Sequence, residues 1–389
     1  MKISSEEYYS DSEWKLFKQE AAKYQTPFLL VNLDIVKKSY QEVEKFFPFS
    51  DVYYAVKANP ASEIITLLDS LGCNFDIASI YEMESVLACG VKPDKISFGN
   101  TIKKLSDIRL AYSKGLRLFA TDSEDDLRSI AAAAPGSNIY VRILTEGTAT
   151  ADWPLSRKFG CHPDMATDLL LLARKLKLNP YGVSFHVGSQ QRDVGTWDTA
   201  ISITKYIFDY MADEGINLEM INLGGGLPAN YISQTNPLEV YASEIKRYLE
   251  EDFGENMPRI IMEPGRSLVG NAGVLISEVV TVARKSRVAV DRWIFLDAGK
   301  FNGLVETWDE CIKYPLVCEK ADFTCEDGVL AGPTCDSQDI MYEHYRYRIP
   351  VNLCPGDRIY WLTAGAYTAS YASVDFNGFP PLKTHFIGE

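Results

Sequence analysis

Lys57 is a residue whose type and position could allow covalent chemistry. It follows a short segment, Val52 to Val56, whose β-branched and aromatic residues predict a buried strand, and Pro60 ends the stretch. A lysine at the end of a strand is most often solvated, which is the favoured interpretation of this stretch alone. In a desolvated site, however, the pKa of a lysine falls, and the neutral amine can form a Schiff base with an aldehyde cofactor.

Similar short apolar segments recur along the chain and alternate with longer amphipathic ones, which predicts strand–helix units. The predicted strands lie at residues 52–57, 74–78, 95–99, 117–121, 138–144, 181–187, 219–223 and 259–263. Eight such units predict an α/β fold, a (β/α)8 barrel of the TIM type. An open doubly wound sheet would carry its glycine-rich phosphate loop after the first strand. Here the glycine-rich turn follows the seventh strand, which favours the barrel.

A second domain is predicted where this alternation ends, after Gly265. Four β-rich segments separated by Pro and Gly follow, at 274–282, 287–296, 347–353 and 357–363. We expect an all-β domain, a β-sandwich or barrel, that also takes in the N-terminal strand at 28–32. The predicted boundaries are 36–270 for the barrel, with 1–35 and 271–389 forming the β-domain.

Polar residues gather where the predicted barrel strands end, and these C-terminal ends line the active sites of such barrels. They are Lys57, Asp76, Glu82, Arg142, His186, Ser189, Gly224, Gly225, Gly226, Glu263 and Arg266. Glycines let backbone N–H groups approach an anion closely, and arginine can hold phosphate through its planar fork. A carboxylate can pair with a protonated pyridine nitrogen, and an imidazole can lie flat on an aromatic ring. Lysine, phosphate site, carboxylate and stacking group together are what pyridoxal 5′-phosphate (PLP) requires.

Each of these residues also has a purely structural interpretation. The run Gly224–Gly226 is as compatible with a tight turn as with a phosphate site. A single histidine such as His186 is more often a hydrogen-bonded core residue, and Glu263 is also suited to pair with Arg266. An active site is favoured because polar or glycine residues recur at the same end of so many strands.

The composition excludes several classes of function. The chain has 389 residues, 46% of them hydrophobic, and a formal net charge of −14. Such an acidic chain is not expected to bind nucleic acid or an anionic membrane. Met1 is followed by polar residues without the apolar core of a signal peptide, and no apolar run is long enough to span a bilayer. The eight cysteines lack the close pairs of a zinc site, so we expect no metal and reduced thiols in a cytoplasmic protein.

Eight motifs, in order, resemble the alanine racemase-type (fold-type III) PLP-dependent decarboxylases, from about Pro27 to the C-terminus. The motifs are YAVKANP, FDIAS, FHVGSQ, NLGGG, EPGRS, GPTCDSQD, GAYT and FNGF. The resemblance is closest to the ornithine/lysine decarboxylases, with diaminopimelate decarboxylase as a near relative. It implies a (β/α)8 barrel with a β-domain, PLP as the cofactor, and a homodimer with composite active sites.

The resemblance also implies a role for each matching residue. Lys57 forms the internal aldimine with PLP, His186 stacks on the pyridine ring, and Glu263 holds the ring nitrogen. The implied phosphate ligands and further supports are Ser189, Gly225, Gly226, Arg266 and Tyr367, and then Asp76, Glu82 and Arg142. The substrate amine displaces Lys57, the bond between Cα and the carboxylate breaks, and the pyridinium ring takes the electrons.

Cys335 and Asp336 of the CDSQD motif are implied to reach into the active site of the other subunit. Cys335 would return a proton to Cα after loss of carbon dioxide, and Asp336 would bind the distal ammonium of the substrate. The structural alternative is a small buried residue beside a turn-forming aspartate.

The distal group of the substrate should be recognised by carboxylates. Asp336 and Asp339 suit the ammonium of ornithine or lysine, whereas diaminopimelate enzymes usually carry Glu directly after the cysteine. Ornithine decarboxylases place an Asp shortly after a Phe-Asn pair, and the equivalent position here is Thr307. Glu306 or Asp309 is expected to replace that Asp and to lengthen the pocket. Since one methylene is worth only ~1–3 kcal/mol, we expect conversion of L-ornithine to putrescine and also of L-lysine to cadaverine.

Three alternatives stay open at this point. One is a meso-diaminopimelate decarboxylase. Another is an alanine racemase-like enzyme, whose partner base is usually a tyrosine and which the CDSQD motif disfavours. The third is a non-catalytic decarboxylase-like regulator, a class that typically loses cofactor or cysteine residues. Lys57, Glu263, Arg266 and Cys335 are all present here.

Overall fold

The computed structural model describes residues 3–145, 150–153, 157–320 and 324–388. Internal contacts divide the chain into two units. The β-domain unit comprises residues 1–36, 229–234 and 266–389, and the barrel unit comprises 37–228 and 235–265. The segment 229–234, which the sequence analysis included in the barrel, therefore packs with the β-domain.

The barrel unit is built on a closed parallel barrel, and all eight predicted strands are present. In chain order the strands are β2 (Asp51–Ala55), β3 (Asn74–Ile77), β4 (Ile96–Phe98), β5 (Leu118–Thr121), β6 (Asn138–Arg142), β8 (Asn179–Ser184), β10 (Met220–Asn222) and β11 (Arg259–Met262). Pairing of β11 with β2 closes the barrel. Buried side chains from five strands pack together in its core: Tyr53, Leu118, Ala120, Tyr140, Met220 and Ile261.

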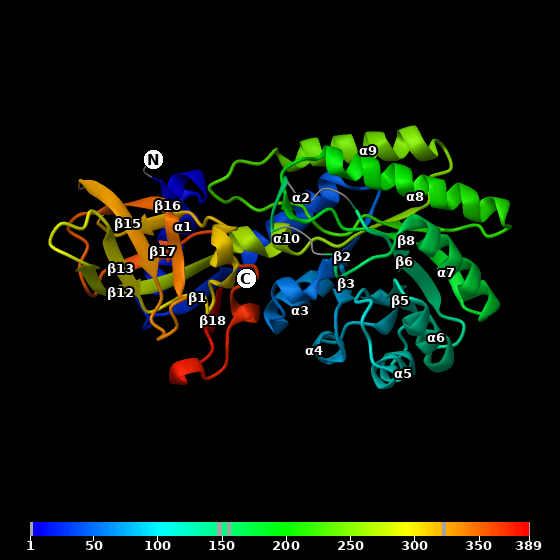
Figure 1. The fold of residues 1–389 in the computed structure, drawn as a ribbon, viewed down its shortest axis with the longest axis horizontal. Coiled ribbons are helices and arrows are strands. Elements are labelled where there is room, and N and C mark those ends of the chain that lie inside the picture. The colour runs from blue at the N-terminus through cyan, green and yellow to red at the C-terminus, as the bar shows by residue number, and fades with distance from the viewer. Residues whose placement is uncertain (1–2, 146–149, 154–156, 321–323, 389) are drawn as a thin grey trace. The chain divides into compact units, whose positions relative to one another are not determined.

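Helices follow most of the barrel strands and surround them (Figure 1). They are α3 (Ser62–Ser70), α4 (Ile80–Ala88), α5 (Leu105–Ser113), α6 (Glu124–Ala133), α7 (Pro163–Lys175), α8 (Gly195–Asp213) and α9 (Leu238–Phe253), and α2 (Leu33–Phe46) precedes the first barrel strand. In α7, Pro163 starts the helix, and Arg174 and Lys175 lie at its negative C-terminal end. The strands β7 (Ala151–Trp153) and β9 (Ser189–Gln191) form a small separate sheet, and short 3₁₀ turns lie at η2 (Val56–Ala58) and η3 (Pro93–Lys95).

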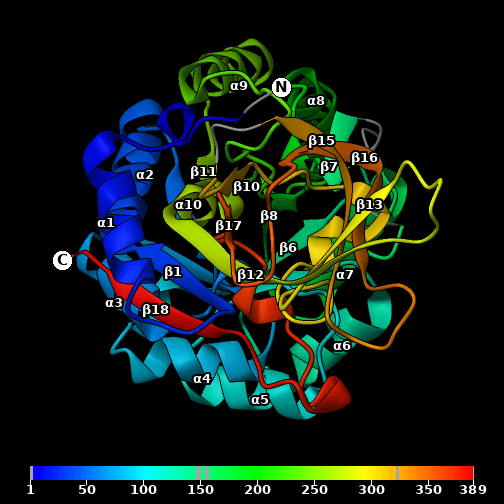
Figure 2. The ribbon, with the colours of Figure 1, turned by 90° about the vertical axis from the view of Figure 1, so that its left-hand side faces the viewer.

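The β-domain is an eight-stranded sheet, and it takes in the N-terminal strand as predicted (Figure 2). Its strands are β1 (Phe28–Asn32), β12 (Gly273–Arg284), β13 (Arg292–Leu296), β14 (Leu316–Cys318), β15 (Cys325–Ala331), β16 (Ile340–Pro350), β17 (Arg358–Trp361) and β18 (Lys383–Ile387). β1 pairs antiparallel with β12 and parallel with β18. The sequence analysis did not predict β14, β15 or β18, which are short or interrupted by charges.

The remaining helices of the β-domain are short. They are α1 (Asp11–Ala21), α10 (Arg266–Val269), η1 (Ser5–Glu7), η5 (Gly270–Ala272), η6 (Val305–Glu310), η7 (Ala369–Tyr371) and η8 (Phe376–Gly378). Ser10 caps α1 by accepting a hydrogen bond from the Glu13 N–H. None of the helices that the structure describes is long and apolar enough to cross a membrane.

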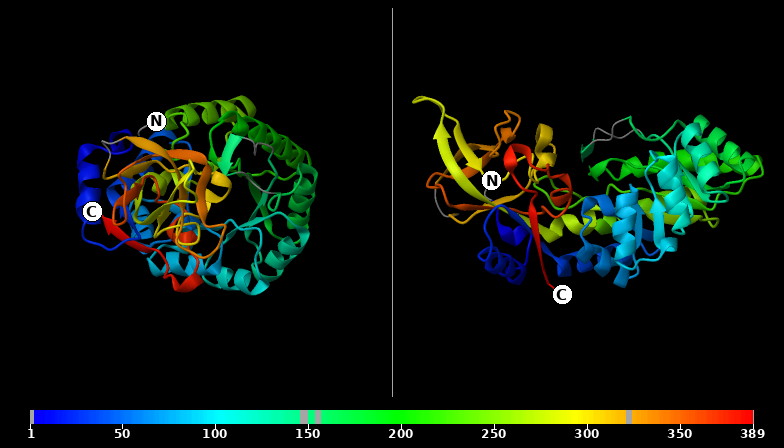
Figure 3. Two further views of the ribbon diagram at one scale, coloured as in Figure 1. Left: turned by 60° about the vertical axis from the view of Figure 1, so that its left-hand side comes forward. Right: turned by 90° about the horizontal axis from the view of Figure 1, so that it is seen from below.

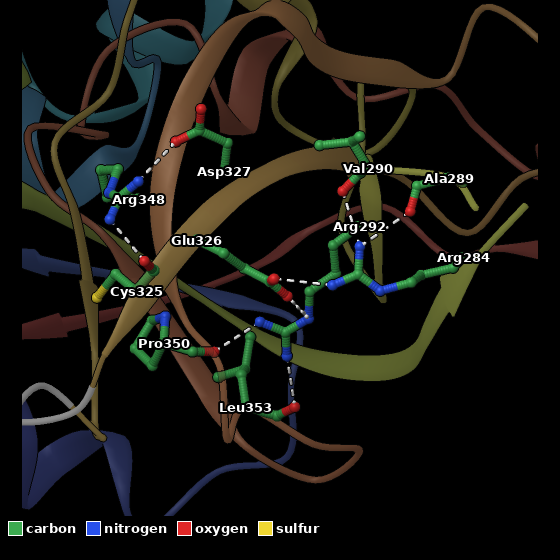
Figure 4. Close-up of polar contacts among 10 residues, drawn as sticks. All are labelled: Arg284, Ala289, Val290, Arg292, Cys325, Glu326, Asp327, Arg348, Pro350 and Leu353. Atoms are coloured by element: carbon green, nitrogen blue, oxygen red, sulfur yellow. Dashed lines mark hydrogen bonds and ion pairs between the residues drawn. The ribbon is translucent and has the colours of Figure 1, made fainter. Parts of the chain in front are cut away.

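A cluster of arginines lies in the β-domain next to the hairpin of β12 and β13 (Figures 3 and 4). The buried Arg292 donates to the carbonyl oxygens of Pro350 (2.7 Å) and Leu353 (2.9 Å). Arg284 and Arg292 both contact the Glu326 carboxylate. These bonds satisfy backbone carbonyls at and just beyond the end of β16, so we assign this cluster a structural role.

Candidate active site

Lys57 lies two residues beyond Ala55, the last residue of β2, within the turn η2. Its Nζ is 3.6 Å from Oδ2 of Asp76, which β3 carries on the neighbouring position of the barrel. The Lys57 side chain is 44% exposed in the described chain. Asp51, the carboxylate nearest to Lys57 in sequence, does not contact it but pairs with Arg259 at the opposite end of β2. Carboxylate contact, not burial, is therefore the main feature of the Lys57 environment.

Asp76 is buried, with a side chain only 4% exposed. Burial raises the pKa of its carboxyl well above the usual range, Glu263 raises it further, and Lys57 opposes the shift. Its Oδ1 has no hydrogen-bond partner among the described residues. The absence of a side chain at Gly99 leaves room for this carboxylate, because a Cβ there would overlap it. An unsatisfied buried oxygen next to an amine is typical of a site prepared for a ligand.

Glu263 follows β11 and is held by a neighbouring strand. Its Oε1 accepts a hydrogen bond from Asn222 Nδ2 at 2.5 Å, and Asn222 Oδ1 accepts from the Gly224 N–H at 2.9 Å. Glu82, at the start of α4, accepts from the Ala78 N–H at 2.7 Å, and burial raises the pKa of its carboxyl. Asn222, the first residue of the NLGGG motif, was given no role from the sequence alone.

His186 follows β8 and is neutral. Burial lowers the pKa of its imidazole well below the usual value, and Arg142 and Lys57 lower it further. Its Nδ1 accepts a hydrogen bond from the Gly188 N–H at 3.1 Å, so the ring proton lies on Nε2. Arg142, at the end of β6, lies 5.1 Å from the ring centre of Phe159. The imidazole is thus fixed in one orientation and one tautomer.

The turn Gly224–Gly226 needs glycine for steric reasons. Gly224 and Gly226 have φ values of +64° and +111°, which side chains disfavour. A Cβ at Gly225 would lie 2.7 Å from the Glu263 carbonyl oxygen, and one at Gly226 would lie 2.8 Å from that of Gly188. The Gly226 carbonyl accepts from the Gln191 N–H of β9, the short strand that Ser189 begins. The turn presents bare backbone, as anion-binding turns do.

In the β-domain, Arg266 is buried in the first position of α10. Its Nη1 and Nη2 contact the two carboxylate oxygens of Glu306 at 2.7 and 2.6 Å, and Nη1 also donates to the Tyr231 hydroxyl at 2.9 Å. Tyr367 places its ring centre 4.7 Å from the guanidinium and has a φ of +57°. A bulky residue at positive φ is strained, and such strain gathers at functional sites.

The CDSQD segment is anchored by its last aspartate. Asp339 is buried and accepts from the Lys300 N–H (2.8 Å) and from the N–H and hydroxyl of Thr334 (3.0 and 2.7 Å). Cys335 is exposed, and its N–H donates to Asn377 Oδ1 at 2.9 Å. Asp339 is therefore committed to holding the loop. Cys335 lies at the surface of the described unit, which contradicts the interpretation as a small buried residue.

A cavity of about 280 Å³ opens in the β-domain beside this loop. It is lined by Lys300, Asp309, Glu310, Ser337, Gln338, Ile340, Glu343 and His344. Thr307 is buried and donates to the Leu304 carbonyl, so it does not line the cavity. Glu310, which the sequence analysis missed, accepts three backbone N–H bonds from β16 at 2.7 Å, and these outweigh burial and lower its pKa. Three carboxyl groups and the ammonium of Lys300 line the cavity, so negative charge exceeds positive charge in its lining.

The barrel residues fit PLP. Lys57 supplies an amine, the glycine turn offers backbone that a Cβ would obstruct, and the neutral imidazole of His186 is suited to stack on a ring. The unsatisfied Asp76 Oδ1 and the oriented Glu263 add acceptors for a protonated nitrogen. Among the described residues, no group of three or more His, Cys, Asp or Glu side chains could hold a metal ion.

Comparisons with known proteins agree with this chemistry. Residues 33–270 match the pyridoxal-binding domain of the pyridoxal-dependent decarboxylases. The lysine/ornithine decarboxylase of Selenomonas ruminantium is 31% identical over 367 residues, covering 94% of this chain and 90% of that protein. The solved lysine/ornithine decarboxylase of Vibrio vulnificus, complexed with cadaverine, superimposes with a TM-score of 0.88 at 28% identity, over 98% of this chain and 100% of that one.

A relative of another kind is also similar. Antizyme inhibitor 2 of Xenopus laevis is 31% identical over 374 residues, covering 92% of this chain and 80% of that protein. Sequence similarity at this level therefore includes proteins named as enzymes and a protein named as an inhibitor.

Proposed function

We propose, from the premise that this chain belongs to the pyridoxal-dependent decarboxylases, that it removes the α-carboxylate of basic L-amino acids. The products would be putrescine from L-ornithine and cadaverine from L-lysine. The observation that carries the proposal is the Lys57 ammonium 3.6 Å from the buried Asp76 at the C-terminal end of a closed parallel barrel.

PLP, when bound, supplies a ring that withdraws electrons from the bond to be broken. In this proposal Lys57 holds the cofactor covalently and exchanges with the substrate amine. Glu263, oriented by Asn222, holds the ring nitrogen and keeps it protonated. His186 stacks on the ring, and because its imidazole is neutral it does not oppose that protonation.

The phosphate group would be bound by five residues that follow barrel strands or belong to the β-domain. They are Ser189, Gly225, Gly226, Arg266 and Tyr367, with Asp76, Glu82 and Arg142 supporting the barrel part of the site. The positive φ of Gly226 and the exposed backbone of the turn support this assignment.

We further propose a homodimer in which Cys335 and Asp336 act in the site of the partner subunit. The exposure of Cys335 in the described unit supports this, because it leaves the thiol open to another chain. Cys335 would donate a proton to Cα, and Asp336 would bind the distal ammonium. A cytoplasmic location stays a prediction, which cell fractionation would test.

The substrate class is supported by the β-domain cavity. Asp309, Glu310 and Glu343 line this cavity. Asp309 and Glu310 follow Thr307 on η6. We propose that Asp309 takes the place of the missing family aspartate, while the Glu310 carboxylate is already bound by three N–H groups. Because one methylene changes binding by only ~1–3 kcal/mol, we propose that both ornithine and lysine are accepted.

The test is release of carbon dioxide by purified protein with PLP, for L-ornithine, L-lysine, L-arginine and meso-diaminopimelate. Release from ornithine or lysine that disappears in Lys57→Ala is the expected result. Release from diaminopimelate alone would replace the substrate proposal with the first alternative. Protein that releases no carbon dioxide, with or without bound PLP, would favour a non-catalytic regulator. The Xenopus laevis relative is named as an inhibitor.

A further inference from the structure

The carboxylate of Glu306 is fully engaged by a cationic side chain of the β-domain. Its two oxygens lie 2.6 and 2.7 Å from the terminal nitrogens of Arg266, and the two side chains are 2% and 3% exposed. We infer that Glu306 is a positioning residue that holds Arg266 for a phosphate group and cancels its charge, and that it does not bind the substrate. This inference rests on the proposed function and deepens it.

Three contacts fix the plane of the Arg266 guanidinium before any ligand arrives. The paired bonds to Glu306 match the geometry of two parallel N–H donors, which an arginine offers and a lysine does not. The hydroxyl of Tyr231 accepts a further bond at 2.9 Å, and the ring of Tyr367 lies 4.7 Å away. A guanidinium held in this way loses little conformational freedom when a phosphate binds.

Glu306 cannot easily leave Arg266 to bind a substrate ammonium. A carboxylate so deeply buried would be left without its charge partner, which is strongly unfavourable. The backbone of η6 is also anchored next to it, because the Ile312 N–H donates to the Glu306 carbonyl and the Thr307 hydroxyl to that of Leu304. The sequence-based expectation that Glu306 is a ligand of the substrate is therefore not supported, and Asp309, which lines the cavity, is the better candidate.

The pair also changes the electrostatics of phosphate recognition. The charges of Arg266 and Glu306 sum to zero, so an arriving phosphate meets a neutral pair. Attraction must then come from the orientation of the guanidinium and from neutral donors such as backbone N–H groups and the Tyr367 hydroxyl. Replacement of Glu306 by glutamine keeps an oxygen that accepts from Arg266, yet leaves a net positive charge. Coulomb attraction should then tighten the binding of a phosphate group.

The experiment titrates PLP into cofactor-free protein for wild type, Glu306→Gln and Tyr231→Phe, with inorganic phosphate as a competing probe. For Glu306→Gln we expect PLP binding tighter on the order of tenfold, an advantage that shrinks as salt is raised. For Tyr231→Phe, which removes one orienting bond and keeps the charges, we expect weaker binding. Asp327→Asn, which removes an exposed carboxylate of the same unit, is the charge control and should bind like wild type.

Steady-state kinetics at saturating PLP separate positioning from substrate binding. Glu306→Gln should leave KM for ornithine within about twofold of wild type. A large rise in KM would assign Glu306 to the substrate and overturn the inference, as would unchanged or weaker PLP binding. If Glu306→Gln does not fold, unchanged PLP binding in Tyr231→Phe would overturn it.

Different results would overturn the proposed function and the inference about Glu306. Wild type that binds no PLP and releases no carbon dioxide overturns the proposed function, and the inference with it. Wild type that binds PLP and releases carbon dioxide, beside Glu306→Gln with the same affinity for PLP, overturns the inference alone.

Discussion

At the scale of residues, the candidate site consists of ionisable groups whose neighbours set their charge. Asp76 is buried 3.6 Å from the Lys57 ammonium, and His186 is held neutral by burial and two cations. Glu263 is oriented by Asn222, which is in turn bonded to the glycine turn. Each of these groups is restrained before a ligand binds, which lowers the cost of ordering the site.

Asp76→Asn should change how the stability of cofactor-free protein depends on pH. The folded-state pKa of Asp76 is raised, so stability is fully present below its unfolded pKa of about 4 and falls as pH rises towards the folded value. Asparagine removes this loss. Thermal or urea unfolding should therefore show that the variant gains stability relative to wild type as pH rises from acid to neutral.

The control for this prediction is Asp209→Asn, an exposed carboxylate on α8 paired with Lys205. Its stability curve should run parallel to that of wild type. If the Asp76→Asn curve also runs parallel, the buried carboxyl is not the source of the pH dependence.

At the scale of elements, two segments shape the site: the turn after β10 and the 3₁₀ segment η6. The turn brings its three glycines against the backbone of Phe185, Glu263 and Gly188, respectively. η6 carries Glu306 towards Arg266 and Asp309 towards the cavity, because its backbone kinks at Trp308 and Asp309, where φ becomes positive at Asp309. A single segment of six residues thus serves two different purposes.

Gly226→Ala should destabilise the barrel and weaken PLP binding. The new Cβ would meet the Gly188 carbonyl at 2.8 Å and Val187 Cγ2 at 2.9 Å, at a φ of +111°. Gly215→Ala is the matched control, since its φ is +71° but no atom lies within 4 Å of the added Cβ. We expect the unfolding free energy of Gly226→Ala to fall by about 1–3 kcal/mol more than that of the control. Equal losses would show that the turn tolerates a side chain.

Asp309→Asn should lower kcat/KM for both ornithine and lysine if Asp309 binds the distal ammonium. Loss of a charged hydrogen bond is worth roughly 1.5–3 kcal/mol, or about 10- to 100-fold. The reference variant is Asp291→Asn, which removes an exposed carboxylate paired with Arg346 in the same domain. Unchanged kcat/KM in Asp309→Asn would remove the cavity from the substrate site.

At the scale of the whole molecule, the proposed chemistry draws on both units of the chain. The amine, the ring-binding residues and the glycine turn belong to the barrel unit. Arg266, Tyr367, Cys335 and the cavity belong to the β-domain unit. A homodimer lets a loop of one chain complete the site of another, which is the arrangement that we propose for Cys335.

Mixing two inactive variants tests this arrangement. Lys57→Ala and Cys335→Ala should each lose decarboxylation, the latter by roughly 10²–10⁴-fold if Cys335 donates a proton. If subunits exchange freely and the sites are composite, half of the dimers are mixed and each has one intact site, giving about a quarter of wild-type activity. No recovery, with exchange verified by differently tagged chains, would place Cys335 in the site of its own subunit.

Local sequence signals accounted for most of the framework. The eight barrel strands were predicted because each short apolar segment is followed by an amphipathic one, and this periodicity is a property of neighbouring residues. The ends of these strands identified Lys57, Asp76, His186, Glu263 and the glycine turn as one group, since a barrel brings all C-terminal strand ends to one side. That these residues bind PLP stays a prediction.

Contacts between distant residues were decided only by the tertiary structure. Arg266 and Glu306 are 40 residues apart, and nothing in their local patterns separated a partner of arginine from a ligand of substrate. The same holds for Asn222 with Glu263 and for Asp339, which anchors its loop instead of facing a ligand. Sequence alone determined which residues lie at the site, because strand ends follow local periodicity. Packing decided which partner each charge takes, because burial and pairing depend on residues far along the chain.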